Sequence, residues 1–231
     1  MNNSMKIKAV VIFIIYSSIC YSQSGNIFLE FNYNTFSHTS LKSFQQEFIK
    51  DIPEIPIQVN DNFPSNIGFT LGYKVGKINT SLFFSYNSTG GKISYSDYSG
   101  VIRITQPLDA YTFGGEYQIN FSKNKEGFSL GLRAFSMLSN LTVENYTQIL
   151  NNITDEKVKL QSINFGLGGR LIYEYPVSFF IIKASLGFDI TFGGTLKFKE
   201  NNDFYLENNN GEEVKSNWSG LRTGLGVEIP I

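Results

Sequence analysis

The sequence predicts an all-β fold, an eight-stranded antiparallel up-and-down transmembrane β-barrel with short periplasmic turns and long extracellular loops. Three observations support this prediction. Apolar and polar residues alternate with a period of two in eight segments, as in strands with one apolar face. Glycine recurs on the polar face, where it leaves room inside a narrow barrel. Short and long connections alternate along the chain, which is the plan of outer-membrane barrels.

The eight predicted strands each set an apolar face against a face of polar residues and glycine. The first four are 27–33 (IFLEFNY), 67–75 (IGFTLGYKV), 80–87 (TSLFFSYN) and 111–121 (YTFGGEYQINF). The last four are 128–135 (FSLGLRAF), 163–174 (INFGLGGRLIYE), 180–191 (FIIKASLGFDIT) and 221–231 (LRTGLGVEIPI). Between them lie the short connections 76–77, 122–127 and 175–178 and the long connections 37–66, 88–107, 137–158 and 193–216.

A soluble sandwich or a lipocalin-like barrel is the alternative interpretation of an alternating sheet. Water-exposed strand faces favour Thr, Lys and Glu, and glycine weakens them, so the glycine-rich polar face favours a barrel lumen. Tyrosines near both ends of the strands predict two aromatic girdles facing lipid. These are Tyr73, Tyr117, Tyr173 and Tyr175 near the short turns, and Tyr33, Tyr86 and Tyr111 near the long loops.

Residues 1–22 are predicted to form a signal peptide that is cleaved between Ser22 and Gln23. A basic start precedes an apolar run that is too short to span a bilayer. The barrel domain is then 23–231. Lipidation of Cys20 is an alternative, although the residue before it is bulky and β-branched.

The composition excludes several classes of protein. Charged residues make up 17% and aromatic residues 15% of the chain, a mixture that suits a sheet with a large apolar face. The formal net charge of −1 is too even to indicate a nucleic-acid partner. Cleavage of the signal removes the single Cys, so neither a disulfide nor a Cys-ligated metal is expected, and no cofactor is predicted.

The chain resembles the small outer-membrane β-barrel proteins of the OmpA/OmpX-like superfamily, in the versions found in Bacteroidota. The signal ending "CYSQ", the eight-strand plan and the last strand "GLGVEIPI" carry the resemblance. It implies a monomeric protein of the cell outer membrane that is not an enzyme. The implied partners are outer-membrane lipid and lipopolysaccharide, the barrel-assembly machinery during biogenesis, and an extracellular ligand of unknown kind.

Ten charged side chains share the parity of the lumen face. Charges in a narrow interior must be paired or hydrated, so the sequence predicts an ion-pair network that plugs the lumen. A proton or small-ion path is the alternative, but a selective pore would favour one sign of charge. The five basic residues are Lys74, Arg133, Arg170, Lys183 and Arg222, and the five acidic residues are Glu30, Glu116, Glu174, Asp189 and Glu228.

One salt bridge in this network can be predicted from the register between the fourth and fifth strands. If the turn between the fourth and fifth strands is regular, its centre lies midway between Asn124 and Lys125. Glu116 then lies directly opposite Arg133, and directly opposed side chains come within contact range. The sequence therefore predicts a salt bridge between Glu116 and Arg133.

The first long loop is expected to contain a short helix. Leu41, Phe44, Phe48 and Ile52 recur at helical spacing, and Pro53 stops the run. A capping box is predicted from Ser43 and Gln46. Such a helix would pack locally, lie on the membrane surface or cover the barrel.

The other loops carry the remaining functional expectations. In 88–107 the third and fourth strands are expected to continue beyond the bilayer around a turn at 97–100, which would offer an edge for β-addition by a partner. The acidic loop 193–216 could hold a divalent cation weakly, without an EF-hand spacing. Surface interaction, adhesion or envelope structure through the loops is the predicted function, and a narrow channel is an alternative.

A lipid-modifying enzyme is the second alternative. His38, the single histidine, stands beside Thr39 and Ser40 where the first strand ends. With Asp51 or Asp97 as an orienting acid, these residues could imitate a hydrolase site. Nothing in their spacing enforces that geometry, so a solvated histidine is the simpler interpretation.

Overall fold

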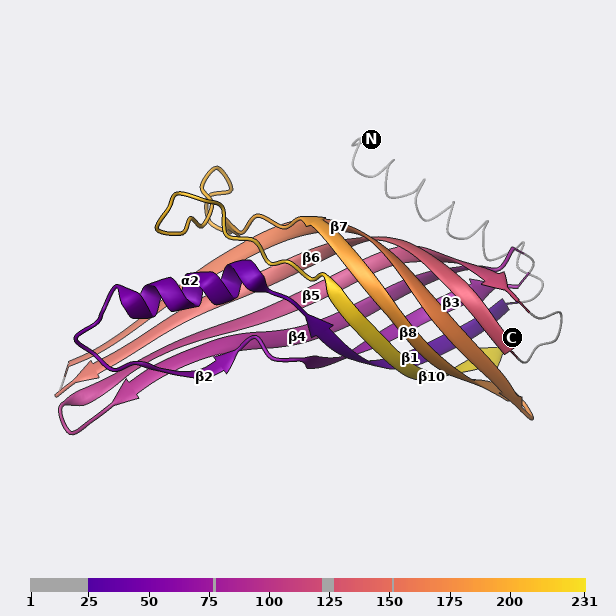
Figure 1. The fold of residues 1–231 in the computed structure, drawn as a ribbon, viewed down its shortest axis with the longest axis horizontal. Helices are drawn as coiled ribbons and strands as arrows, with labels where there is room; N and C mark the ends of the chain where they lie inside the picture. Colours follow the sequence, from indigo (N-terminus) through magenta and orange to yellow (C-terminus); the bar gives the residue numbers. More distant parts are fainter. Residues whose placement is uncertain (1–24, 77, 122–126, 151) are drawn as a thin grey trace, which may run out of the picture.

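The computed structural model describes residues 25–76, 78–121, 127–150 and 152–231, so the predicted signal peptide and the bond between Ser22 and Gln23 lie outside the described residues. Eight antiparallel strands close into a barrel (Figure 1). They are β1 (Gly25–Phe36), β3 (Asn66–Val75), β4 (Thr80–Ser96), β5 (Gly100–Asn120), β6 (Gly127–Ile149), β7 (Asn152–Val177), β8 (Phe180–Gly193) and β10 (Gly220–Pro230). Pairing runs in that order, and β10 pairs with β1 to complete the ring.

Three further elements lie outside the ring. The helix α2 (Thr39–Lys50) follows β1, and the short strand β2 (Gln58–Asn62) pairs with β4 beyond the end of β3. The two-residue strand β9 (Lys197–Phe198) pairs with β7. Within the described ranges, no helix is long and apolar enough to cross a membrane.

Four of the strands are much longer than a bilayer requires. A membrane-spanning strand needs roughly 9–11 residues, whereas β4, β5, β6 and β7 contain 17, 21, 23 and 26 residues. Their outer parts form a projecting sheet, bordered by β2, at the opposite end of the molecule from the C-terminus (Figure 1). The continuation of the hairpin around 97–100 is confirmed. The prediction of a loop at 137–158 is wrong, because β6 and β7 pair through almost all of it.

The outward face of the barrel changes from apolar to mostly polar side chains at the level of Tyr86 and Tyr111. Below it, apolar side chains are exposed all round the ring, for example Ile67 at 73% and Phe165 at 64%. At this level Tyr86 donates a hydrogen bond to Asp109, and the Tyr86 and Tyr111 rings lie 5.3 Å apart. Above it the outward residues are mostly polar or charged, such as Asp109, Arg103 and Glu144, although Ile153 near the tip of β7 is 61% exposed. We call the lower, exposed apolar ring the apolar belt, and an apolar band bordered by tyrosines is what a bilayer requires of a barrel.

The helix α2 covers one face of the projecting sheet (Figure 1). Phe48, on the helix, packs with Ile57 against the buried sheet residues Ile93 and Ile104. The helix therefore packs locally on the sheet. The predicted capping box is wrong, because α2 begins four residues earlier than Ser43. His38 is the N-cap, with a left-handed backbone (φ 44°) and no capping hydrogen bond from its side chain.

Candidate functional site

The centre of the lumen is organised around Arg170 of β7. Its guanidinium contacts Glu30 at 2.8 Å and Glu116 at 2.5 Å, which places it between carboxylates from β1 and β5. All three side chains are almost completely buried. Burial of charge is unfavourable unless the charges are paired and hydrogen-bonded, and Arg170 supplies both.

The predicted register at the β5–β6 turn is confirmed, since Glu116 lies directly opposite Arg133. The predicted salt bridge is present, with 3.8 Å between the Nε of Arg133 and a carboxylate oxygen of Glu116. The shorter contacts of Glu116 are nevertheless with Arg170. Arg133 also lies 3.7 Å from Asp189, and its guanidinium stands over the Phe83 ring at 4.2 Å. Asp189 in turn accepts a hydrogen bond from Arg222 at 3.0 Å.

The periplasmic end of the lumen has its own cluster of charges. The ammonium of Lys74 lies 3.0 Å from Glu174 and 3.7 Å from Glu228. Lys183 is the one member of the ten predicted lumen residues for which the described structure contains no ion pair within 4.0 Å. Its ammonium instead lies 4.5 Å from the centre of the Phe28 ring, a cation–π contact. The structure thus places all ten charged side chains in the lumen.

An aromatic cluster covers the extracellular end of these charges. Trp218 is fully buried and donates a hydrogen bond from Nε1 to Ser139 at 2.9 Å. Its ring meets His38 edge-on at 4.6 Å and Phe36 at 5.4 Å, and Phe63 lies against His38. We call Phe36, His38, Phe63 and Trp218 the aromatic plug. Trp218 was not predicted to be functional, because its only signal in the sequence is that it is the single tryptophan and lies in a polar loop.

His38 is held in its neutral form by the aromatic plug. Burial lowers its pKa to about 4, against a hydrogen bond to Ser216 that favours the charged form, and Lys42 lowers the pKa further. The ring nitrogen Nδ1 lies 2.8 Å from the carbonyl oxygen of Ser216. The expectation of a solvated histidine is therefore wrong, because the aromatic side chains around it exclude water.

The structure does not assemble the hydrolase-like site considered from the sequence. Ser40 accepts a hydrogen bond from the Lys215 backbone, Asp51 accepts two from Asn209, and Asp97 caps the turn at the far tip of the β4–β5 hairpin. Among the described residues, none of these three side chains forms a hydrogen bond or an ion pair with His38. Among the described residues, no three His, Cys, Asp or Glu side chains are grouped to hold a metal ion.

The projecting sheet has an open edge along β7. The Lys199 N–H donates to the Lys159 carbonyl, and the Gly194 N–H to the Ile163 carbonyl. Odd-numbered residues of β7 therefore direct their backbone groups away from β6. Beyond Lys159, the strand that would pair with 152–158 is absent from the described chain. This open edge replaces the one predicted at the β4–β5 hairpin, since β2 and β6 pair with the outer parts of β4 and β5.

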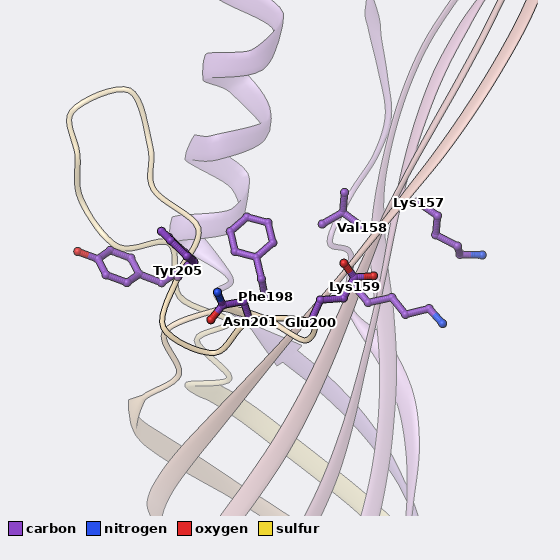
Figure 2. Close-up of a pocket in the computed structure, with 8 residues that line it drawn as sticks. Lys157, Val158, Lys159, Phe198, Glu200, Asn201 and Tyr205 are labelled. Atoms are coloured by element: carbon purple, nitrogen blue, oxygen red, sulfur yellow. The ribbon is translucent and has the colours of Figure 1, made fainter.

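An apolar pocket of about 550 Å³ lies beside this open edge (Figure 2). Val158 points toward Phe198, and Phe204 and Tyr205 also line the pocket, whereas the side chains of Lys157 and Lys159 point to the other side of the strand. A second cavity, of about 260 Å³, lies between α2 and the sheet and shares Val158 and Phe198 with the first. The two cavities adjoin at Val158 and Phe198 beside the open edge, and we call them together the apolar groove.

Comparison with known proteins supports the fold. No protein-family model and no curated protein sequence matches the chain. A major outer membrane protein from Thermus thermophilus matches over 90% of this chain and 99% of its own, with 9% identity and a TM-score of 0.50. Ail of Yersinia pestis, at 11% identity, covers 90% of this chain and 98% of its own with a TM-score of 0.39. Neisserial surface protein A, at 10% identity, covers 89% and 96% with a TM-score of 0.39.

The chain therefore has the fold of the small outer-membrane β-barrel proteins. This outcome confirms the fold class predicted from the sequence. The apolar belt and its tyrosine border agree with the outer membrane as the location that this fold indicates.

Proposed function

We propose that this chain is a non-enzymatic outer-membrane barrel that binds a protein partner outside the cell by β-addition to the open edge of β7. In this mode an extended segment of the partner pairs with an exposed sheet edge, and pockets beside the edge select its side chains. The barrel anchors the projecting sheet, and the helix α2 stiffens it from one face.

The proposal rests on the backbone N–H and C=O groups of Ile153, Asp155 and Lys157 at the edge of β7. Each directs an N–H and a C=O away from β6, and no hydrogen bond to them is present in the described structure. At the other margin of the projecting sheet the short strand β2 pairs with β4, and on the β7 side β9 covers the edge at Lys159. The apolar groove at Val158 adds room for a large apolar side chain of the partner strand.

The test uses the folded full chain in detergent and a phage library of linear peptides. Peptides that bind should slow hydrogen exchange at the amides of Ile153, Asp155 and Lys157. Lys157→Pro removes an edge N–H without touching the bonds to β6, so it should abolish this binding. The matched control Lys157→Gln keeps the backbone and should bind.

Two results would contradict the proposal. In one, the selected peptides protect amides elsewhere; in the other, the proline variant binds as well as the glutamine variant. Both would move the interaction away from the β7 edge and leave the barrel fold unaffected.

A closed lumen is the second part of the proposal. The ion pairs around Arg170 and the aromatic plug support it, because they fill the barrel with packed and paired side chains. A monomer reconstituted in a planar bilayer should show no sustained conductance. Reproducible porin-like steps would favour the narrow channel instead.

A further inference from the structure

The open edge of β7 presents different side chains on its two faces. Successive residues of a strand point to opposite faces, so Glu156 lies with Val158 on the face that α2 covers. Both residues line the cavity between α2 and the sheet. Asp155 lies with Lys157 on the outward face, and Figure 2 shows Lys157 pointing away from Val158. A strand added at this edge therefore meets a separate set of side chains on each face.

Two neighbouring carboxylates of this edge have no cationic partner in the described structure. Asp155 and Glu156 are both exposed, and among the described residues neither makes an ion pair. Lys157, the next residue, is paired with Glu144 of β6 instead. Because Asp155 and Glu156 point to opposite faces, a partner strand neutralises both only if it carries two adjacent basic residues.

The strand β9 shows in which direction a strand approaches this edge. It runs antiparallel to β7, with Phe198 opposite Leu160, and its last bond joins the Lys199 N–H to the Lys159 carbonyl. The chain then turns back, and the Phe198 N–H donates to the Phe204 carbonyl. An incoming antiparallel strand continues this ladder from the next residue of β7 onward, in the same direction as β9.

The apolar pocket lies where the first side chain of such a strand would stand. The residue opposite Val158 shares its face with Val158, and Phe198, Phe204 and Tyr205 line the pocket there (Figure 2). A large apolar side chain would cover these rings, of which that of Phe204 is 63% exposed. Toward the tip of the edge Ile153 is 61% exposed on the outward face, and an apolar residue opposite it would cover it.

We propose that the partner segment is a basic strand that runs antiparallel to β7, with the six-residue pattern apolar, any, basic, basic, any, apolar. Its first residue lies opposite Val158 and its last opposite Ile153, so the two basic residues lie opposite Glu156 and Asp155. The pattern rests on the proposed β-addition and specifies which segment the edge accepts. Main-chain hydrogen bonds supply the affinity that all sequences share, and the directly opposed side chains supply the selectivity.

A second copy of this chain fits the edge less well than a basic segment does. Two identical antiparallel strands pair about a two-fold axis, which places the central residue opposite itself. The pairing that uses the whole edge, 152–158, is centred on Asp155 and sets two Asp155 carboxylates directly opposite each other. Like charges in this position destabilise a sheet, and Glu156 still lacks a cation.

The test uses the folded full chain in detergent and synthetic peptides that carry the pattern between threonine flanks. The lead peptide has phenylalanine at position one, lysine at three and four, valine at six and threonine elsewhere, and fluorescence anisotropy measures its dissociation constant. A peptide of the same composition with lysine at positions two and five, opposite Lys157 and Thr154, should bind about tenfold more weakly. Hydrogen exchange at the amides of Ile153, Asp155 and Lys157 locates the binding.

The charge preference should reverse when the charges of the edge are reversed. The variant Asp155→Lys, Glu156→Lys should bind the lead peptide about tenfold or more weakly, and it should prefer a peptide with glutamate at positions three and four. The control Glu54→Lys, Asp61→Lys makes the same change in net charge at exposed residues of the segment from α2 to β2, and it should bind as the parent does. The gel shift on boiling checks that each variant folds.

Failure of the charge pattern and failure of β-addition give different results. Peptides that protect the edge amides without preferring lysine at positions three and four would overturn the basic pattern and leave β-addition intact. Tighter binding of the reversed sequence would overturn the antiparallel direction. If no peptide protects these amides, β-addition and the pattern both fail. Protection that rises with protein concentration in the absence of peptide would assign the edge to a second copy of the chain.

Discussion

The lumen and the projecting sheet use charge in opposite ways. In the lumen, Arg170 satisfies Glu30 and Glu116 at once, and both sides of each pair are buried. On the outward face of the projecting sheet, Lys159 and Lys199 face each other without an acid partner in the described structure and remain exposed. Buried charge must find its partners within the chain, whereas exposed charge is free to find them in a ligand.

Removal of Arg170 is expected to have the largest effect on the free energy of unfolding. Arg170→Met leaves Glu30 and Glu116 buried without their main partner, so the free energy of unfolding should fall by roughly 3–5 kcal/mol. Urea unfolding in detergent measures it. The matched control is Arg103→Met on the projecting sheet, which loses only an exposed stacking contact with Tyr146 and should change little. Equal losses in both variants would erase the distinction between the two regions.

The aromatic plug should make the stability of the barrel depend on pH. The pKa of His38 is lowered from 6.5 to about 4 in the fold, so between these values the unfolded chain binds a proton that the folded chain does not. This contribution is complete above pH 6.5 and is lost as the pH falls toward 4, by roughly 3 kcal/mol in total.

The measurement for His38 compares the parent with His38→Phe by urea unfolding at several pH values. Relative to His38→Phe, the parent should lose free energy of unfolding as the pH falls from 6.5 to 4. Outside this range the difference in unfolding free energy should stay constant, since carboxylates elsewhere titrate equally in both proteins. A difference that is flat across this range would show that His38 is already hydrated in the fold.

A smaller effect is expected for the pair Glu116 and Arg133. Their 3.8 Å contact is secondary, because Glu116 bonds Arg170 more closely. A double-mutant cycle with Glu116→Gln and Arg133→Met should therefore give a coupling of about 1 kcal/mol. Coupling that exceeds the value for Glu116 with Arg170 would mean that the cross-strand neighbour is the main partner after all.

The smallest effect on the barrel is expected from the helix contact. Phe48→Ala should loosen α2 from the sheet, because its ring packs with Ile93 and Ile104. Hydrogen exchange should accelerate in α2 and the outer part of β4, while the urea midpoint of the barrel stays unchanged. A lower midpoint would indicate that the projecting sheet and the barrel unfold as one unit.

The sequence by itself determined the eight strands, the face that each side chain occupies and the register at the β5–β6 turn. These properties are local, since an alternating pattern fixes two faces and a short turn fixes which residues lie opposite. Ten lumen charges could therefore be identified before any partner was known. The alternation also indicated where the strands pass through lipid, because only there must one face be apolar.

The tertiary structure decided the features that the alternation of apolar and polar residues does not predict. Barrel closure brings Arg170 of β7 between β1 and β5, which are not its neighbours in the ring, so the main partner of Glu116 lies across the lumen. Above the apolar belt both faces can be polar, and strands then look like loops, as 137–158 did. The burial of Trp218 and the open edge of β7 likewise depend on which segments fold back onto the sheet, and no local pattern encodes that choice.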